Sequence, residues 1–481
     1  MSEKTHSLLT FKTVNPWNNT DISTYEYVNY KNIESCLVQL NQGFKNWKLL
    51  NYRERQEKIK PIADYFRDNI NEIAKSITLE MGKPFSQAFA EVQKSIEAIN
   101  YLCQCSLDDV LMQKIDTRFK KDYEHVVIYK PKGIILSIMP WNFPFWQSIR
   151  MIVPTLIVGN CVLLKSSEQT PTSGDYILKA FRSANLSDVF GHLIFSHDLT
   201  ESVLADERVC GVSLTGSTQA GFKVSEIAGR FMKKSVFELG GSDAYVVLSD
   251  ADLKLSARSI AVSRLQNTGQ SCIACKRVFV DETIISIFLN ELVREFDKYK
   301  FGDLFSAQTK LGPLSHEKFV KQDQQLFDYI SAHVDVIYLK KPENDFTSTE
   351  NYSLKNFSPV RILKIKKDAP KEIYDFINQT EFFSPTLIVM SFDHVDQCLE
   401  RVNASIYGLG GAVFTKNTDY GRIIASQFES GMVCVNDFIK SDYELPFGGN
   451  KKSGHGRELG VAGFTEFCDS QLISVNLKDL V

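Results

Sequence analysis

The stretch "PKGIILSIMPWNFPFWQSIRMIVPTLIVGNCVLLKSSEQTP" (131–171) reads as a strand, a helix and a second strand. The apolar runs at 133–139 and 160–166 have the length and composition of buried strands, and a helical segment follows "PWNFP" between them. Two strands joined by a crossover helix form the basic unit of a parallel sheet. This stretch therefore predicts an α/β fold.

Short apolar runs alternate with amphipathic segments along most of the remaining chain. The first series continues with "HLIFS" (192–196), "VCGVSLT" (209–215) and "KSVFEL" (234–239). The second series comprises "KRVFVDE" (276–282), "PVRILKI" (359–365), "SPTLIVM" (384–390), "GAVFTK" (411–416) and "GMVCVND" (431–437). Two series predict two α/β domains. Upstream, residues 52–80 have helical spacing, and 114–133 suggest an extended hairpin outside both sheets.

The composition is that of a globular protein, with 43% hydrophobic and 23% charged residues in a chain of 481. The formal net charge of −3 gives no reason to expect nucleic acid or an acidic membrane as a partner. "MSEKTHSLLTFK" lacks an apolar signal core, and the apolar stretch at 151–164 is too short to span a bilayer. Ten cysteines in such a chain indicate reduced thiols in the cytoplasm.

Two cysteines lie three residues apart in "QNTGQSCIACKR" (266–277). A structural zinc ion needs four ligands, and the eight histidines are scattered, so we expect no metal site. A thioredoxin-like pair is expected near the chain start, whereas this pair lies past the middle. A buried structural cysteine and a nucleophile remain as interpretations. The polar, glycine-containing flank places Cys272 at a turn, where its surroundings would have to lower a thiol pKa of about 8.5.

Six motifs occur along the chain in a characteristic order. Glu238 in "FELGGSD" (237–243) precedes Cys272 by 34 residues. The others are "PWNFPFWQ" (140–147), "LLKSSEQTP" (163–171), "LTGSTQAG" (214–221), "TEFFSP" (380–385) and "PFGGNKKSGHGRELG" (446–460). Together they resemble the signatures of the NAD(P)-dependent aldehyde dehydrogenase family, from about residue 15 to the end. The resemblance implies a Rossmann-type cofactor domain, an α/β catalytic domain and a β oligomerisation arm.

The resemblance also implies how the chain is divided. Residues 1–113 and 132–239 would form the NAD-binding domain, and 240–440 the catalytic domain. Residues 114–131 and 465–481 would form the oligomerisation arm, and 441–464 would return to the cleft near substrate and cofactor. In the family the hairpin and the C-terminal strand, here 470–476, pair between subunits. We therefore expect a homodimer or homotetramer.

Oxidation of an aldehyde needs a nucleophile, donors for an oxyanion and a base that activates water. Cys272 is the candidate nucleophile. In the family the side-chain amide of Asn142 and the backbone N–H of Cys272 bind the oxyanion. Glu238 matches the family's general base, although without the resemblance it would be an ordinary surface glutamate. Because Glu238 ends an apolar strand, we expect it where active-site groups of α/β sheets gather.

The cofactor segment differs from the usual Gly-x-Gly-x-x-Gly fingerprint, because four residues separate Gly216 from Gly221. A strand ends at Gly216 and a helix follows, so N–H groups there can bind phosphate, and Ser217 could add a hydroxyl. In the family Lys165 and Glu168 bond ribose hydroxyls. A carboxylate at position 168 should repel a 2′-phosphate, so we predict NAD as the preferred cofactor, with NADP as the alternative.

The resemblance adds three further residues to the cofactor site. They are Trp141, together with Glu381 and Phe383, which would position the nicotinamide ribose and ring. The family has a glycine directly after Phe383, whereas this chain has Ser384. A left-handed backbone at this position would strain a serine.

The motifs look closest to those of the bacterial succinate-semialdehyde dehydrogenases. That substrate carries a second carboxylate, so its pocket should hold a cation or hydroxyl donors. Arg150 interrupts an apolar run and matches an arginine that binds this carboxylate, and Ser441 matches a serine used in the same way. Gln266 stands where some members have a second arginine, which Arg264 could replace. The alternatives are another small aldehyde substrate, or a catalytically silent interaction protein on the same fold.

Cys275 leads to a separate hypothesis. Lying three residues past Cys272, it could form a reversible disulfide that stops activity and protects the thiol from over-oxidation. The alternative is a packed thiol without a role.

Overall fold

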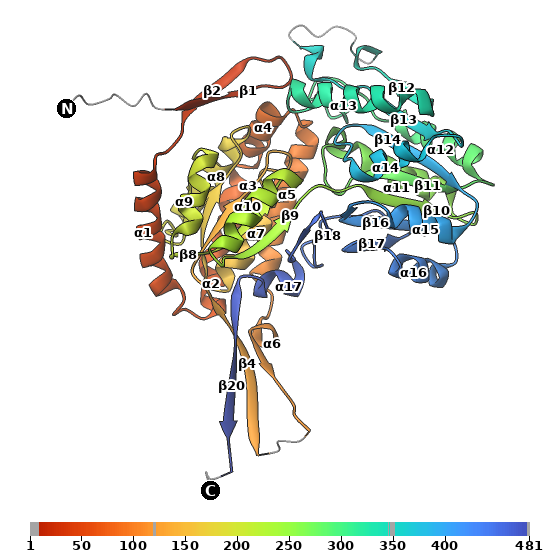
Figure 1. Cartoon of the computed structure of the whole chain (residues 1–481). Coiled ribbons are helices and arrows are strands. Elements are labelled where there is room, and N and C mark those ends of the chain that lie inside the picture. The colour runs from red at the N-terminus through yellow and green to blue at the C-terminus, as the bar shows by residue number, and fades with distance from the viewer. Residues whose placement is uncertain (1–8, 119–121, 345, 347–351, 479–481) are drawn as a thin grey trace.

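Figure 1 shows the computed structural model of the chain, which describes residues 9–118, 122–344, 346 and 352–478. Two large sheets form the two halves of the body, and a narrow three-stranded arm projects from one of them (Figure 1). A two-stranded hairpin, β1 (Thr10–Val14) and β2 (Asp21–Glu26), extends between the two halves at the top. The predicted mixture of strands and helices in two sheets is confirmed.

The first half contains a six-stranded sheet with the order β19-β9-β8-β5-β6-β7. Its strands are β5 (Ile134–Ile138), β6 (Cys161–Lys165), β7 (Phe190–His192), β8 (Val209–Thr215), β9 (Lys234–Glu238) and β19 (Gly454–His455). The first five are parallel, and β19 is antiparallel to β9. The chain proceeds from β5 to β6 and β7 on one side and then returns to β8 on the other. Ligands of such sheets bind at this switch point, outside the carboxyl ends of the strands.

The run expected as a strand at 192–196 overlaps the observed strand only at His192. Strand β7 pairs with β6 from Phe190 to His192 and then ends. Because β6 itself ends at Lys165 and the chain turns into a loop, residues beyond 193 have no neighbouring strand to pair with. The prediction was therefore wrong for residues 193–196.

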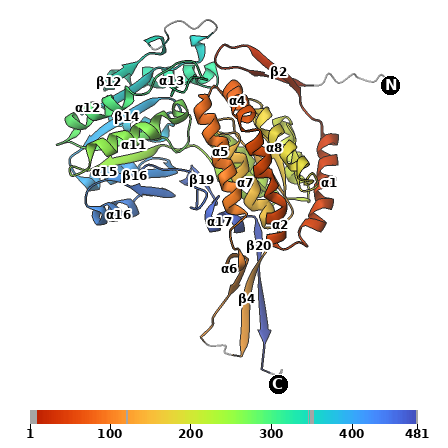
Figure 2. The ribbon, with the colours of Figure 1, turned by 180° about the vertical axis from the view of Figure 1, so that it is seen from behind.

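Helices cover both faces of the six-stranded sheet. They are α1 (Tyr30–Trp47), α2 (Tyr52–Ile59), α3 (Pro61–Asp68), α4 (Ile70–Met81), α5 (Phe85–Leu102), α7 (Trp146–Ile157), α8 (Pro171–Ser183), α9 (Thr200–Ala205) and α10 (Thr218–Arg230). Helices α9 and α10 lie in front of the sheet in Figure 1, and α5 and α7 lie in front of it in Figure 2. The helical spacing at 52–80 corresponds to the three helices α2, α3 and α4. Helix α3 begins at Pro61, because proline lacks an N–H and favours the first position of a helix.

The second half contains a seven-stranded sheet with the order β12-β13-β14-β11-β10-β16-β17. Its strands are β10 (Asp243–Val247), β11 (Cys275–Asp281), β12 (Val334–Lys340), β13 (Val360–Ile365), β14 (Thr386–Phe392), β16 (Gly410–Phe414) and β17 (Met432–Val435). Its helices are α11 (Leu253–Leu265), α12 (Ile285–Phe296), α13 (Glu317–Ile330), α14 (Lys371–Gln379), α15 (Val395–Asn403) and α16 (Thr418–Ser426). In β10, Tyr245 and Val247 pack into one core and Ala244 and Val246 into another, as in a sheet buried on both faces. Sequence reasoning missed β10 and β12.

The arm consists of β3 (Met112–Lys114), β4 (Tyr123–Pro131) and β20 (Cys468–Asn476), in the order β20-β4-β3. The predicted hairpin is confirmed, since β3 pairs antiparallel with β4. Strand β20 pairs along one edge with β4 of the same chain, from Cys468 beside Pro131 to Asn476 beside Tyr123, and its expected pairing between subunits stays a prediction. Pairing within the chain follows from α17 (Gly460–Thr465), which delivers β20 to the base of the arm.

A short pair, β15 (Tyr407–Gly408) and β18 (Asn450–Lys451), and the single-turn helix α6 (Asp108–Leu111) complete the elements. Within the described residues, none of the helices combines the length and the apolar character needed to cross a membrane.

Candidate active site

The segment before Cys272 has an unusual backbone. Helix α11 ends in a short 3₁₀ turn at Gln266–Gly269, and Cys272 follows in the turn before β11. Asn267 and Thr268 have φ angles of 52° and 53°, and Gly269 has one of 79°, so three consecutive residues are left-handed. For a β-branched residue such as Thr268 this conformation costs about 1–3 kcal/mol and persists only where the surroundings enforce it.

Three side chains, from the turn itself and from α11, enforce this conformation. The hydroxyl of Thr268 donates to the carbonyl of Gly312 at 3.2 Å and accepts its N–H at 2.9 Å. The side-chain oxygen of Gln270 accepts the N–H of Ser315 at 2.9 Å. The guanidinium of Arg264 donates to the carbonyl of Gly269 at 2.6 Å. Strain held in this way marks functional sites, and here it immediately precedes the predicted nucleophile.

Glu238 is the last residue of β9, as its position after an apolar run predicted. Its side chain is buried, and neither carboxylate oxygen has a hydrogen-bond partner among the described residues. Burial, and next the charge of Glu458, raises the pKa of Glu238 well above its usual value, while Arg150 and Arg457 oppose the shift. A buried carboxyl with a raised pKa is suited to take and release protons near neutral pH.

The strand end that carries Glu238 approaches the Cys272 turn closely. A Cβ atom on Gly241 would lie only 2.5 Å from the carbonyl oxygen of Cys272. A Cβ atom on Gly240 would lie 2.6 Å from a carboxylate oxygen of Glu381. The two glycines of "ELGG" therefore permit the approach of both segments.

Cys272 carries a free, half-buried thiol. Burial raises its pKa to about 12, Lys276 and Arg150 act in the opposite direction, and the carboxylates Glu381 and Glu238 raise it further. Glu238 and Cys272, 34 residues apart in the chain, are thus close enough for their charges to interact. Because the thiolate is the nucleophilic form, a base must remove the proton during reaction.

Asn142 lies beside the same turn. Its side-chain amide donates to the carbonyl of Gln270 at 3.0 Å, and Asn267 donates to the carbonyl of Asn142 at 2.9 Å. Buried Glu91 of α5 accepts the N–H groups of Phe145 and Trp146, both at 3.0 Å, and so fixes the loop that leads into α7. The side-chain amide of Asn142 is thereby held against Gln270, which precedes the predicted nucleophile by two residues.

The two residues predicted to bind a substrate carboxylate lie together. Arg150, buried on α7, approaches the hydroxyl of Ser441 at 3.5 Å, and the indole N–H of Trp146 donates to that hydroxyl at 3.0 Å. The guanidinium also forms an ion pair of 2.5 Å with Glu458 and lies 4.5 Å from the ring centre of Phe447. Sequence reasoning quoted the "GRELG" motif that contains Glu458 without giving this residue a role.

Lys94 of α5 is a second cation at the same place, and sequence reasoning missed it. Its ammonium donates to the carbonyl of Ser441 and lies 4.2 Å from the ring centre of Trp146. Burial, and next the charge of Arg150, lowers the pKa of Lys94 to about 8. A lysine on a helix is ordinarily solvated, so no local sequence signal identifies it.

Arg264 does not take the place of the second substrate arginine that some family members have. The guanidinium of Arg264 is fully buried, and it donates to the carbonyls of Gly269, Cys275 and Phe382. Gln266 is exposed. Arg264 therefore ties the Cys272 turn to the segment after α14 and has no part in the Ser441 cluster.

The carboxyl ends of β6 and β8 carry the predicted cofactor residues. Lys165 ends β6, is buried, and lies 3.2 Å from the carboxylate of Glu168. Gly216 and Ser217 separate β8 from α10, and the hydroxyl of Ser217 accepts the N–H of Ala220 at 3.2 Å as the helix N-cap.

These residues fit a dinucleotide. The N-terminus of α10 and buried Lys165 lie on either side of the switch point, where phosphate and ribose would need them. The buried hydroxyl of Thr215, at the end of β8, has no partner among the described residues and offers a further donor. Because the hydroxyl of Ser217 already caps the helix, backbone N–H groups would be the principal donors to a phosphate.

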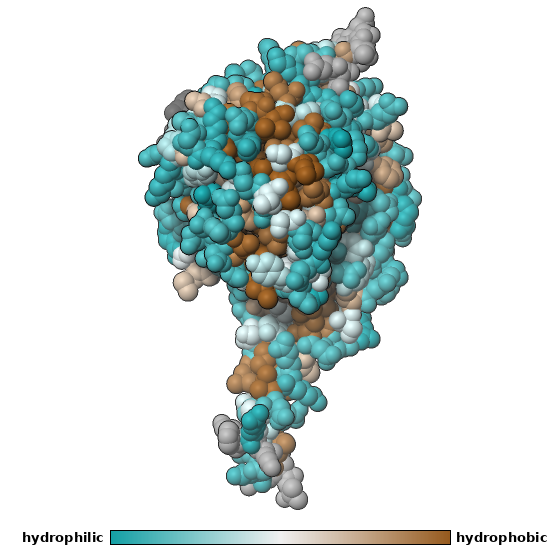
Figure 3. Space-filling model, turned by 90° about the vertical axis from the view of Figure 1, so that its right-hand side faces the viewer, coloured by the Kyte–Doolittle hydropathy of each residue, from teal (hydrophilic) through white to brown (hydrophobic). Residues whose placement is uncertain are grey.

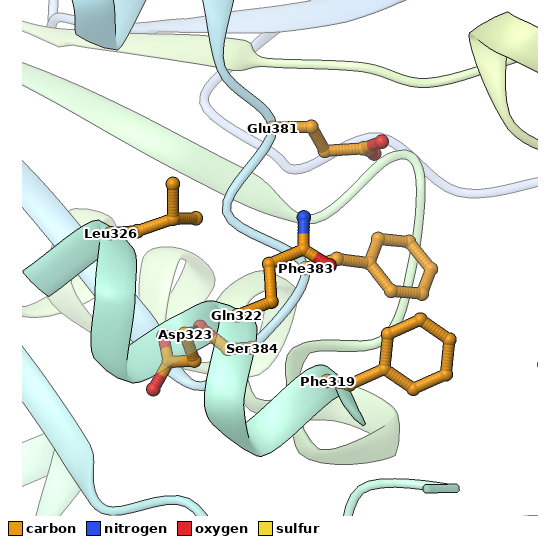
Figure 4. A pocket seen from close by; sticks show the side chains of 7 residues that line it. All are labelled: Phe319, Gln322, Asp323, Leu326, Glu381, Phe383 and Ser384. Atoms are coloured by element: carbon orange, nitrogen blue, oxygen red, sulfur yellow. Dashed lines mark hydrogen bonds between the residues drawn. The ribbon is translucent and has the colours of Figure 1, made fainter. Parts of the chain in front are cut away.

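Glu381, Phe383 and Trp141 meet at the other end of the site. The carboxylate of Glu381 accepts the N–H of Gly241 at 3.0 Å. The rings of Trp141 and Phe383 pack edge to face at 5.9 Å, and Phe319 lies 5.1 Å from Trp141. Figure 4 shows the pocket beside them, which is lined by Phe319, Gln322, Asp323, Leu326, Glu381, Phe383 and Ser384.

Ser384 is not strained. Ser384 is not among the described residues with positive φ, so the backbone strain expected for a serine in place of the family's glycine does not arise. Its hydroxyl instead donates to the buried carboxylate of Asp323 on α13, which Arg361 also contacts at 2.5 Å. The serine therefore anchors the segment that carries Glu381 and Phe383.

Cys275 lies on β11 and is fully buried. Its N–H donates to the hydroxyl of Ser263 at 3.0 Å, and its sulfur lies 3.7 Å from the carbonyl of Arg277. Cys272 and Cys275 are both free thiols here. A reversible disulfide between them stays a prediction.

Two adjoining α/β sheets, one of Rossmann type, with a cysteine turn facing a buried carboxylate, define an α/β enzyme architecture. A sequence model of the Aldehyde dehydrogenase family matches residues 3–473. The chain belongs to the aldehyde dehydrogenase family. The fold and family that the six motifs indicated are thus confirmed.

Three relatives illustrate the similarity. The succinate-semialdehyde dehydrogenase [NADP(+)] of Deinococcus radiodurans is 34% identical, over 96% of this chain and 94% of its own. The succinate semialdehyde dehydrogenase [NAD(P)+] of Escherichia coli is 33% identical, over 96% of each chain. The crystal structure of the succinic semialdehyde dehydrogenase of Streptococcus pyogenes with NADP+ superposes with a TM-score of 0.88 at 30% identity, covering 97% of this chain and 100% of that one.

Proposed function

We propose that this protein oxidises succinate semialdehyde to succinate with a nicotinamide dinucleotide, through a thioester on Cys272. The observation that carries the proposal is the cluster at Ser441, where Arg150, Lys94 and two hydrogen-bond donors converge. A cluster with two cations favours an aldehyde that carries an anion at its far end. The names of the relatives support the same substrate.

The chain's own residues account for each proton. Glu238 removes the proton of the Cys272 thiol, whose sulfur then bonds to the aldehyde carbon. The resulting oxyanion accepts hydrogen bonds from the side-chain amide of Asn142 and the backbone N–H of Cys272. The bound nicotinamide supplies the acceptor for the hydride. Glu238 releases the first proton to solvent and then removes a proton from water, which attacks the thioester. The carbon–sulfur bond breaks to release succinate, and Glu238 passes the second proton to the sulfur, which restores the thiol.

The choice of dinucleotide depends on Glu168. Its carboxylate, held by Lys165, would repel a 2′-phosphate, and we therefore propose NAD as the preferred cofactor. Two relatives are named for NADP(+) or for both cofactors, so NADP is the competing outcome. Steady-state kcat/KM measured with each cofactor decides, and a several-fold advantage for NADP would contradict the role given to Glu168.

An aldehyde panel tests the substrate. Succinate semialdehyde and butanal have the same carbon chain, and only the first carries a carboxylate. We expect kcat/KM to favour succinate semialdehyde by about tenfold or more, the contribution of one charged hydrogen bond. Equal values would indicate another small aldehyde as substrate, and no NADH formation with any aldehyde would indicate a catalytically silent protein.

Variants of the Ser441 cluster test where the carboxylate binds. Ser441→Ala and Lys94→Met should raise KM for succinate semialdehyde about tenfold and leave KM for butanal unchanged. Arg150→Ala should act in the same direction, but it also leaves the buried carboxylate of Glu458 without its ion pair. Equal effects on both aldehydes would exclude the carboxylate role.

We also propose the division of labour implied by the family. The six-stranded half would bind the dinucleotide, residues 240–440 would carry the nucleophile, and 441–464 would return to the cleft. The arm, 114–131 and 465–481, would join subunits into a homodimer or homotetramer. All ten cysteines are free thiols, which supports a reducing, cytoplasmic setting.

A further inference from the structure

Lys276 is a buried cation that takes no part in the proton transfers of the proposed reaction. It lies on β11, and its side chain is fully inaccessible to solvent. Its ammonium donates to the carbonyl of Ser271 at 2.7 Å and to the carbonyl of Cys272. The same ammonium lies 3.6 Å from a carboxylate oxygen of Glu381. One charge therefore joins the nucleophile turn to the segment predicted to hold the cofactor ribose.

A lysine in this place carries an electrostatic cost that an apolar residue would avoid. Burial lowers the pKa of Lys276, Glu381 and Asp243 raise it, and Arg264 lowers it further. Replacement of buried ion pairs by apolar residues of similar volume is often neutral or stabilising. Packing alone thus gives no reason for a charged side chain here, and a reason must come from what the charge does.

We propose that Lys276 is a positioning residue that holds the Cys272 turn through its two carbonyls and shares its positive charge between the thiolate and Glu381. The proposal rests on Cys272 being the nucleophile of the proposed function. It follows that removing the charge of Lys276 disfavours the thiolate. Removing the charge of Glu381, which competes for the same ammonium, favours it.

The other charges that face the thiol set the scale of the effect. Lys276 is the larger of the two cationic influences that lower the pKa of Cys272, and Arg150 is the smaller. Two carboxylates raise that pKa, Glu381 more than Glu238. Variants of Lys276 and Glu381 therefore probe the dominant charge of each sign, and their expected effects are opposite.

Alkylation of the protein without aldehyde or dinucleotide measures the thiolate directly. Iodoacetamide is added between pH 7 and 10, and the Cys272 peptide is quantified by mass spectrometry. In Lys276→Met we expect the thiol pKa to rise by about one unit, so that the plot of log rate against pH lies below that of the unaltered protein throughout this range. The rate at pH 8 falls by only about threefold, because nucleophilicity rises with thiol pKa. In Glu381→Gln the plot moves the other way. Lys234→Met, an exposed lysine on β9, should follow the unaltered protein.

The outcomes separate this proposal from the proposed function. Plots for both variants that coincide with the unaltered protein, or that move in the same direction, overturn the role of Lys276. Should Lys276→Met fail to fold, as judged by circular dichroism, the Glu381→Gln plot alone decides. A Glu381→Gln plot that coincides with that of the unaltered protein then overturns the proposal. Turnover that persists after complete alkylation of Cys272 would instead refute the proposed function.

Discussion

At the scale of single residues, the site contains groups that reduce stability. Glu238 is buried without a hydrogen-bond partner among the described residues, and Thr268 adopts a left-handed backbone. A buried carboxyl without a partner lowers the free energy of unfolding relative to an uncharged residue at the same position. The proposed function accounts for its presence, because that reaction needs a proton acceptor beside the thiol.

Glu238→Gln should therefore stabilise the protein while it abolishes turnover. The folded-state pKa of Glu238 lies above the unfolded value, so the folded state holds the proton more tightly. The free energy of unfolding then falls as pH rises from about 4.5 towards the folded pKa. We expect a gain on the order of 1–3 kcal/mol at pH 8, a smaller gain at pH 5, and a loss in kcat of about 10²–10⁴-fold.

Urea unfolding at the two pH values and steady-state kinetics measure these changes. Glu226→Gln, on the exposed surface of α10, is the matched control and should alter neither quantity. An equal gain at pH 5 and pH 8 would show that Glu238 does not titrate in the expected range.

At the scale of elements, the site forms where two loops contact each other, the Cys272 turn and the segment at 381–385. Arg264 and Lys276 bridge the Cys272 turn to the segment at 381–385. That segment is in turn anchored to α13, because Ser384 donates to Asp323. The position of Glu381 and Phe383 thus depends on a helix that lies outside all six motifs (Figure 4).

Ser384→Ala removes this anchor. We expect a loss of about 1 kcal/mol in the free energy of unfolding, typical of one hydrogen bond, and a rise of severalfold in KM for the dinucleotide. Ser358→Ala is the matched control, since Ser358 donates to the same carboxylate but lies outside the cofactor segment. It should cost similar stability and leave this KM unchanged. Equal changes in KM for both variants would mean that Asp323 acts through general stability alone.

At the scale of the whole molecule, the two large sheets lie in the two halves of the body and the arm projects from the six-stranded half (Figure 1). Within the described residues β20 pairs with β4 on one side only, and its other edge is open. Leu472, Ile473 and Val475 on this strand are exposed. Figure 3 shows a band of apolar side chains on the seven-stranded half and further apolar atoms on the arm. An open apolar edge is suited to pairing with another chain.

Ile473→Lys with Val475→Lys should weaken the assembly. The two residues are two apart on a strand and share one face, so two charges fall on a single surface. We expect light scattering after size exclusion to show a smaller species, with circular dichroism unchanged. Gln471→Lys, on the same face but already polar, should keep the mass of the unaltered protein. An unchanged mass in the double variant would exclude this face of β20 from the interface.

Local patterns predicted much of the fold and the position of Cys272 in a turn. Apolar runs located most strands, and the end of one run placed Glu238 at a strand end. The errors arose where local pattern was insufficient. Residues 192–196 look like a strand but lack a neighbour, and Pro61 divides one helical pattern into separate helices. Strand β10 was missed because it follows "ELGG" so closely that it read as part of the motif.

The amino-acid order by itself determined the alternation of strands and helices, the order of the motifs and the turn at Cys272, because these depend on neighbours within a few residues. Tertiary structure alone decided which side chains meet. Lys94 reaches Ser441 across 347 positions, and Glu458 pairs with Arg150 from the other end of the chain. No local periodicity records such contacts, since they arise only when distant segments pack and exclude water from the charges between them.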